Sequence, residues 1–334
     1  MKKIISFQED NVDYSRVIDI TLRLSSVCNF KCNYCSQYDN DTKPTEYENL
    51  KIILEKFISN LKNLDFYDKV NWYIHGGEPT MYPKFIQIML DMDSFHKQVN
   101  LDYEIEVQTN ASYKNLDKFQ ILKDINISFL CSYQNHQNNP IQYKKFVSNL
   151  LELNMLSCVD IMLENFGTEN EYYNINNIYE WVKEKRIESN KKFGIQCNTI
   201  DGSDNDLPDT YNKFLTDSNF AEKYNIKYND GSEEILDRTT VVINGINDFK
   251  FFRCNAGKNN LIIDTMDKEE IKIYKCFSDI IYQKAYPIYK FKFSENIDTN
   301  IKSILKLLKP TLCIHPKCVC ELQIPKKRIK YGNM

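Results

Sequence analysis

The sequence predicts an α/β fold: a partial barrel of six strand–helix units, (β/α)6, followed by a small cysteine-rich α+β region. Three observations predict it. Segments with the apolar pattern of buried strands alternate with segments of helical periodicity, which indicates a parallel sheet with right-handed crossovers. Glycine, polar or cysteine residues follow each expected strand, where barrels of this kind carry their sites. Most of the 11 cysteines cluster in two parts of the chain.

The elements follow in order along the chain. The run "VIDITLRLSS" has the pattern of a buried strand, "KVNWYIHGGEP" stops at a glycine pair, and "YEIEVQTNAS" alternates with period two. Strands are expected over 17–26, 69–79, 103–112, 125–134, 156–166 and 192–201. Apolar residues at helical spacing predict helices over 45–64, 83–97, 116–124, 143–154 and 174–189.

The pattern changes near residue 202, where a polar segment, "DGSDNDLPDTYNKFLTDSN", begins. A hairpin is expected about Asn229-Asp230-Gly231, because this run favours tight turns. The expected division is a barrel over 1–201, a polar connector with a hairpin over 202–249, and a cysteine-rich domain with a basic tail over 250–334.

Composition excludes several classes of protein. The net charge of −3 gives no global field that would attract nucleic acid, and no run approaches the ~20 apolar residues of a membrane span. The N-terminus turns acidic before any long apolar run, so no signal peptide is expected. A cytoplasmic protein is the expectation, and in a reducing compartment spaced cysteines indicate metal binding or catalysis rather than disulfides.

The first cysteine group is Cys28, Cys32 and Cys35, a C-x3-C-x2-C array directly after the first strand. A structural zinc site usually takes four protein ligands, so three thiols in one loop are one short. A [4Fe–4S] cluster can leave one iron open to an outside ligand. The array therefore favours an open cluster beside the barrel mouth.

An aromatic residue, Tyr34, precedes the last cysteine of the array, and the second strand ends in "GGEP", with Gly76, Gly77 and Glu78. Together these features resemble the radical S-adenosylmethionine enzymes. The resemblance implies that the three thiolates hold three irons and that the fourth iron chelates the amino and carboxylate groups of S-adenosylmethionine. One electron, from a reductase or flavodoxin-type donor, then yields a 5′-deoxyadenosyl radical that abstracts a hydrogen atom from the substrate.

The resemblance also implies cofactor contacts. Gly76, Gly77 and Glu78 would bind the methionine amino group, Tyr34 would pack near the adenine, and Ser132 would touch the ribose. Asn110 ends the third strand in "TNA", where relatives often have "TNG", and Glu164 ends the fifth strand. The alternative for the strand-end Ser and Asn is a turn-forming role.

Five further cysteines lie near the C-terminus: Cys254, Cys276, Cys313, Cys318 and Cys320. The "CNAG…ID…C" run resembles the start of the SPASM and twitch extensions of the same enzymes, over roughly 250–322. A full SPASM domain has more cysteines, so the resemblance implies one auxiliary [4Fe–4S] cluster. Cys254, Cys276, Cys318 and Cys320 are the preferred ligands and Cys313 the competitor, with a structural zinc site as the alternative. His315 is expected to be an exposed loop residue.

Two more thiols, Cys131 and Cys197, fall near strand ends and could face the substrate. A thiol S–H can hand a hydrogen atom to a carbon radical, as epimerases of this family need. The alternative is a buried, packed thiol.

The substrate stays open at this point. A peptide would be modified by cross-linking, thioether formation or epimerisation; a small molecule such as a sugar or aminocyclitol would undergo dehydrogenation or epimerisation. A third possibility, from another class, is a non-catalytic iron–sulfur or zinc protein. The "GGEP" run argues against it, because a cluster holder needs no S-adenosylmethionine site.

Overall fold

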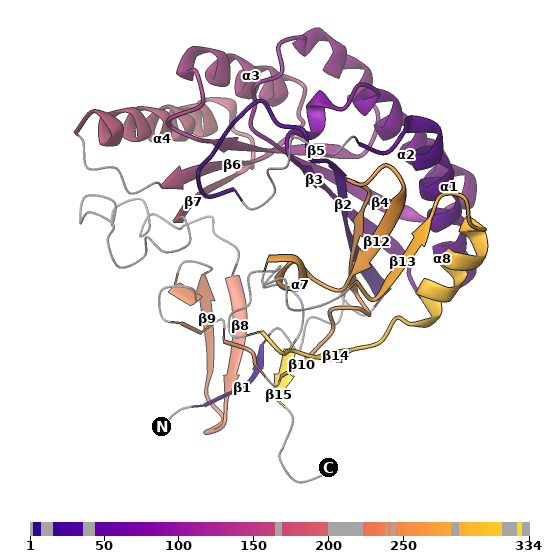
Figure 1. Ribbon diagram of the computed structural model, residues 1–334. Helices are drawn as coiled ribbons and strands as arrows, with labels where there is room; N and C mark the ends of the chain where they lie inside the picture. Colours follow the sequence, from indigo (N-terminus) through magenta and orange to yellow (C-terminus); the bar gives the residue numbers. More distant parts are fainter. Residues whose placement is uncertain are drawn as a thin grey trace.

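The structure is a computed structural model, and it describes residues 3–7, 16–35, 44–163, 169–199, 223–237, 240–241, 245–246, 248–250, 252–281, 287–315 and 326–328. Within these residues the chain forms two sheets. The larger one is a curved, helix-covered sheet, and the smaller one lies below it in Figure 1.

The larger sheet has nine strands in the order β13-β12-β11-β2-β3-β4-β5-β6-β7. Its first six strands along the chain are β2 Val17–Ser25, β3 Lys69–Gly76, β4 Asp102–Thr109, β5 Ile127–Tyr133, β6 Leu156–Leu163 and β7 Gly194–Thr199. Each pairs in parallel with the next. The six strands and the parallel partial barrel predicted from the sequence are confirmed.

Helices cover the outer, convex face of this sheet (Figure 1). They are α1 Tyr47–Asn63, α2 Phe85–Val99, the 3₁₀ segments η2 Pro79–Met81 and η3 Leu116–Leu122, α3 Pro140–Glu152 and α4 Glu169–Ser189. The start of α3 shows how the sequence sets a boundary: Pro140 occupies the first turn, and the Asn139 side chain accepts from the N–H groups of Ile141 and Gln142.

The two faces of the sheet differ in chemistry. On β2 the even positions, from Ile18 to Leu24, are apolar and join the core under the helices. The odd positions, from Asp19 to Ser25, are polar and face the barrel interior. Hydrogen-bonded pairs link the polar residues of neighbouring strands: Asn71 with Asp19, Arg23 with Asp264, and Asn198 with Asp160. The barrel interior is therefore lined with paired polar groups.

His96 is buried between the sheet and the helices. Trp72 Nε1 donates to His96 Nε2 at 2.8 Å, so the ring is neutral and its Nδ1–H donates to the Leu101 carbonyl at 3.1 Å. Burial lowers the pKa of His96 to about 4. The histidine therefore binds a proton at higher pH in the unfolded chain than in the folded protein. As the pH falls from ~6.5 toward 4, the free energy of unfolding decreases by ~3 kcal/mol.

Urea unfolding of the apoprotein at pH 7 and at pH 4.5 measures this effect. We expect the loss between the two pH values to shrink in His96→Gln and to stay unchanged in His136→Gln, because His136 is exposed. Equal losses in the parent and in His96→Gln would contradict the assignment.

The C-terminal region departs from the expected domain division. Strand β11 Asn260–Asp264 pairs in parallel with β2, and β12 Glu270–Tyr274 and β13 Tyr289–Lys292 continue antiparallel from it. Helix α8 Ile297–Lys306 then packs against α1. Strands β11 to β13 and helix α8 thus extend the barrel rather than form a separate domain, because apolar Leu261 and Ile263 continue the core of β2.

The smaller sheet has the strand order β14-β10-β15-β1-β8-β9. Its strands are β1 Ile4–Phe7, β8 Lys223–Tyr228, β9 Glu233–Asp237, β10 Phe252–Cys254, β14 Thr311–Leu312 and β15 Lys326–Arg328. The predicted hairpin is confirmed, with Gly231 at φ +84° in the turn between β8 and β9. The N-terminal strand was assigned to the barrel, but it lies in this sheet, where Phe7 packs with Tyr224 and Phe249.

Among the residues searched, no helix is both long and apolar enough to cross a membrane.

Candidate functional site

The cysteine loop leaves β2 at Ser25 and lies directly against the glycine pair that ends β3. Gly77 N–H donates to the Ser25 carbonyl at 2.6 Å, and Glu78 N–H donates to the Val27 carbonyl at 2.8 Å. A Cβ at Gly76 would come within 2.3 Å of the Ser25 carbonyl oxygen. A Cβ at Gly77 would come within 2.4 Å of the Val27 carbonyl oxygen. Glycine is needed at both positions because the loop backbone occupies the space of a side chain.

The amide N–H groups of Gly77 and Glu78 are therefore occupied. The Glu78 carbonyl oxygen is also occupied, because it accepts from Met81 N–H at 3.0 Å.

The Glu78 side chain is fully buried and joins the ends of β3 and β4. Its Oε1 accepts from Thr80 N–H at 3.1 Å, from Thr80 Oγ1 at 2.5 Å and from Thr109 Oγ1 at 2.8 Å; Oε2 accepts from Asn110 N–H at 2.7 Å. Burial raises the pKa of Glu78, and these donors counter the shift. The carboxylate thus orders the strand ends beneath the glycine pair, a role that the sequence did not indicate.

We expect Glu78→Gln to destabilise the apoprotein by about 1–3 kcal/mol, because one amide NH₂ would face the donors that now point at the carboxylate. Urea unfolding with both variants purified as apoprotein measures this loss. The matched control is Glu104→Gln, since Glu104 forms an exposed ion pair with Lys69. Equal stability of Glu78→Gln and the parent would contradict this role.

Asn110 holds the cysteine loop from the other side. Its side-chain NH₂ donates to Asn29 Oδ1 at 3.0 Å and lies 3.8 Å from Cys28 Sγ, while its carbonyl accepts from Asn138. Asn29 is held in turn by Ser112. The Asn110 side chain, predicted as a cofactor contact or a turn former, is 7% exposed and contacts the loop itself.

The three thiols differ in exposure. Cys28 and Cys32 are partly buried, Cys35 is exposed, and Cys35 N–H donates to the Cys32 carbonyl at 3.1 Å. Burial raises the pKa of Cys28 to about 11, with smaller contributions from Glu78 and from the other two cysteines. Tyr34, between Cys32 and Cys35, is half-buried. The three sulfur atoms thus share one short loop at the C-terminal edge of the sheet.

Ser132 lies at the same edge, near the end of β5. Its hydroxyl is buried and has no hydrogen-bond partner among the described residues. A buried hydroxyl without a partner is costly unless a ligand supplies one. The placement fits the predicted contact with a bound cofactor. Glu164, predicted beside it, lies outside the described residues.

The predictions for Cys131 and Cys197 are not supported. Cys131 is fully buried in the core between the sheet and α3, and burial raises the pKa of its thiol. Cys197 packs against the same core and alternates with Gln196 and Asn198, which face the interior. Both thiols lie on the helix side of the sheet because their strand positions have the parity of the core residues. The expectation that they face the substrate is therefore wrong.

The C-terminal cysteines form a second group. Cys254, Cys276 and Cys313 lie in one hydrophobic cluster under the smaller sheet, with Phe252, Ala256 and Phe277. Cys254 and Cys313 are on the same face of the β10–β14 ladder, because Cys254 pairs with Thr311 and Phe252 accepts from Cys313 N–H. Cys318 and Cys320 lie outside the described residues. Three of the five predicted auxiliary ligands are therefore brought together.

The expectation for His315 is wrong. It is 3% exposed, and its Nε2 lies 2.8 Å from Asp279 Oδ1 of helix α7 Phe277–Ile281. The sequence feature that could have indicated its burial is its position two residues after Cys313.

The ring of Phe277, next to Cys276, lies 5.5 Å from that of His75, which precedes the glycine pair. The second group thus adjoins the end of β3.

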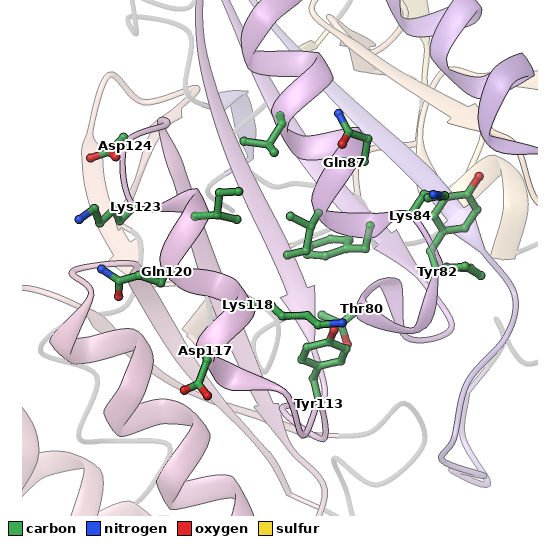
Figure 2. A pocket seen from close by; sticks show the side chains of 15 residues that line it. Thr80, Tyr82, Lys84, Gln87, Tyr113, Asp117, Lys118, Gln120, Lys123 and Asp124 are labelled. Carbon is green, nitrogen blue, oxygen red and sulfur yellow. The ribbon is translucent and has the colours of Figure 1, made fainter.

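A surface cavity of about 710 Å³ lies elsewhere, between the η2–α2 segment and η3. Figure 2 shows its lining, which includes Thr80, Tyr113 and Lys118. None of the predicted site residues lines it. The cavity is on the helix side of the sheet, apart from the cysteine loop.

Comparisons with known proteins match the part of the chain that contains the cysteine loop. Residues 22–155 match the family model described as the Radical SAM superfamily. No curated protein matches the chain.

Solved structures with similar coordinates include "Native anSMEcpe with bound AdoMet and Kp18Cys peptide", at 19% identity and a TM-score of 0.44 over 60% of this chain and 59% of that one. Another is SuiB of Streptococcus suis, at 13% identity and a TM-score of 0.40 over 85% and 65%. This chain thus spans about three-fifths of the length of the first of them.

The matched residues contain the cysteine loop, the glycine pair, Asn110, Ser132 and most of β2 through β5. The part of the chain that carries the site is the part that matches the Radical SAM superfamily model.

Proposed function

We propose that the protein reductively cleaves S-adenosylmethionine and uses the resulting radical to abstract a hydrogen atom from its substrate. The observation that carries the proposal is the three-cysteine loop, held at the C-terminal edge of the parallel sheet by the glycine pair of β3 and by Asn110. The family match over residues 22–155 supports it.

The residues present fit the cofactors that this function needs. Three thiols and no fourth protein ligand in the loop suit a [4Fe–4S] cluster with one open iron. Ser132 offers a buried hydroxyl without a partner. When bound, the cluster and S-adenosylmethionine supply the 5′-deoxyadenosyl radical, given one electron from a reductase or flavodoxin-type donor.

The chain's own residues position these groups. Glu78 and Asn110 fix the strand ends and the loop, so that the three thiols are held before metal binds. Burial and the nearby Arg23 lower the pKa of His75 to about 4, so this ring is neutral at pH 7. The paired polar groups of the barrel interior give a polar substrate hydrogen-bonding partners without leaving an isolated charge.

A peptide is the substrate class we propose, to be modified by cross-linking, thioether formation or epimerisation. The support is the resemblance of residues 250–322 to the SPASM and twitch extensions. The alternative is a sugar or aminocyclitol, because the polar interior suits hydroxyl groups as well as peptide groups.

We also propose an auxiliary [4Fe–4S] cluster on the C-terminal cysteines. The shared cluster of Cys254, Cys276 and Cys313 supports it. Thiolates are the ligands of such clusters, and three buried or half-buried thiols from separate segments are otherwise uncommon in one place.

The test is 5′-deoxyadenosine formation by the anaerobically reconstituted, chemically reduced full chain. Formation of methionine and 5′-deoxyadenosine supports the proposal, and their absence from fully loaded protein overturns it. Substrate class is tested by stimulation of this reaction. A peptide pool that increases turnover, where a pool of sugars and aminocyclitols does not, supports the peptide; the reverse result supports the alternative.

A further inference from the structure

A thiol, a carboxyl group and an imidazole meet in the second cysteine group. The ligand atoms of Cys276, Asp279 and His315 all lie within 4.8 Å of one another, and all three residues are buried. They come from two segments: Cys276 and Asp279 lie at the start of helix α7, and His315 lies in the loop after β14. Burying three such groups together is costly unless they are paired or bind a metal.

Asp279 is already held in place by the chain. Its Oδ2 accepts from Lys275 N–H at 3.3 Å, and its Oδ1 lies 2.8 Å from His315 Nε2. The same hydrogen bond fixes the imidazole, because an ionised carboxylate accepts the Nε2 proton and leaves Nδ1 with its lone pair. Histidines that bind metals nearly always donate their other ring N–H to a carboxylate or a carbonyl in this way.

Sulfur atoms lie in and near the group. Cys276 Sγ belongs to the group itself, and Cys313 Sγ lies 4.0 Å from the main-chain carbonyl oxygen of His315. Cys254 lies diagonally across the ladder from Cys313. Thiolate and imidazole together suit zinc or an iron–sulfur centre rather than magnesium or calcium.

The size of the group also fits a metal. Metal–ligand bonds of about 2.0 to 2.3 Å place two ligands of one zinc ion at most about 4.6 Å apart. The three ligand atoms lie within 4.8 Å of one another, close to this limit, before any metal is added.

We propose that the second metal centre takes His315 as a ligand beside Cys276, and that Asp279 orients the imidazole through its hydrogen bond. This inference rests on the proposed auxiliary metal centre and changes its ligand set from thiolates alone to thiolates with one imidazole. The ligand chemistry is common to an iron–sulfur cluster and a zinc ion, and the experiment separates the two.

The experiment uses the full chain with Cys28, Cys32 and Cys35 replaced by Ala, so that any metal retained belongs to the second centre. Samples are reconstituted anaerobically with iron and sulfide, or with zinc, and iron, sulfide and zinc are counted per chain. X-ray absorption at the edge of the retained metal then shows whether an imidazole is bound. The variants His315→Ala, His315→Cys and Asp279→Asn are compared with His136→Ala, which removes an exposed histidine.

We expect the parent and His136→Ala to show imidazole scattering and His315→Ala to lose it. His315→Cys should keep the metal and lose the imidazole signal, which a merely structural role would not produce. Asp279→Asn should weaken metal affinity by about 10–100-fold, as expected for loss of a partner that orients a ligand.

An unchanged signal in His315→Ala, with metal retained, overturns the role of His315 and leaves the auxiliary centre intact. No metal in any sample with the loop cysteines removed overturns the auxiliary centre and the inference together, while the function of the first loop stands.

Discussion

Replacing Cys28, Cys32 or Cys35 singly with Ala is expected to reduce 5′-deoxyadenosine formation to background. Each thiolate would hold one iron of an open cluster, and the loop has no spare thiol. The measurement is 5′-deoxyadenosine by chromatography after anaerobic reduction, with iron content determined on the same samples.

Cys35 gives the cleanest comparison. It is exposed, so truncation removes almost no packing and should leave apoprotein stability within about 0.5 kcal/mol of the parent. A loss of iron and activity in Cys35→Ala then reports metal binding rather than misfolding. The matched control is Cys197→Ala, whose thiol packs on the helix side of the sheet and should leave activity within a few-fold of the parent. A fully active Cys35→Ala would exclude the loop as the cluster site.

Gly77→Ala is expected to have the second largest effect. The added methyl group would lie 2.4 Å from the Val27 carbonyl oxygen and 2.5 Å from that of Ser26. Both contacts are with backbone, which cannot move aside as a flexible side chain can. The strand end or the loop must shift, at a cost of about 1–3 kcal/mol or more, and the three thiols shift with it.

We therefore expect Gly77→Ala to lose both stability and iron loading, measured by urea unfolding and by iron content. The control is Gly194→Ala, where the nearest neighbour at 2.9 Å is the Cys158 sulfur, a side-chain atom that can adjust. If Gly77→Ala loaded iron like the parent, the loop would not depend on this contact.

The strand–helix order was determined by the sequence alone, because each element has a strong local signal. The β2 run alternates apolar with polar residues, α1 has apolar residues at helical spacing, and the glycine pair marks the end of β3. The cysteine loop was equally local, since Cys28, Cys32 and Cys35 lie within eight positions. Motif and strand position together predicted the family that residues 22–155 match.

Contacts between distant segments were decided only by the tertiary structure. Strand β1 joins β8, over 200 positions away, and β11 extends the barrel sheet beside β2. No periodicity specifies which strand pairs with which, because a strand's pattern gives its faces and not its neighbours. The expected boundary at residue 250 failed for this reason.

The roles of individual side chains were likewise decided by contacts between distant segments. The residue types of Glu78, Cys131 and His315 were visible in the sequence, but their partners were not. The Glu78 carboxylate binds the ends of β3 and β4, the Cys131 thiol faces the core, and His315 is buried against Asp279 of a segment 36 positions away. Sequence determined which chemical groups the chain has at its strand ends. Packing decided which of them face the barrel interior, because one step along a strand turns a side chain to the opposite face.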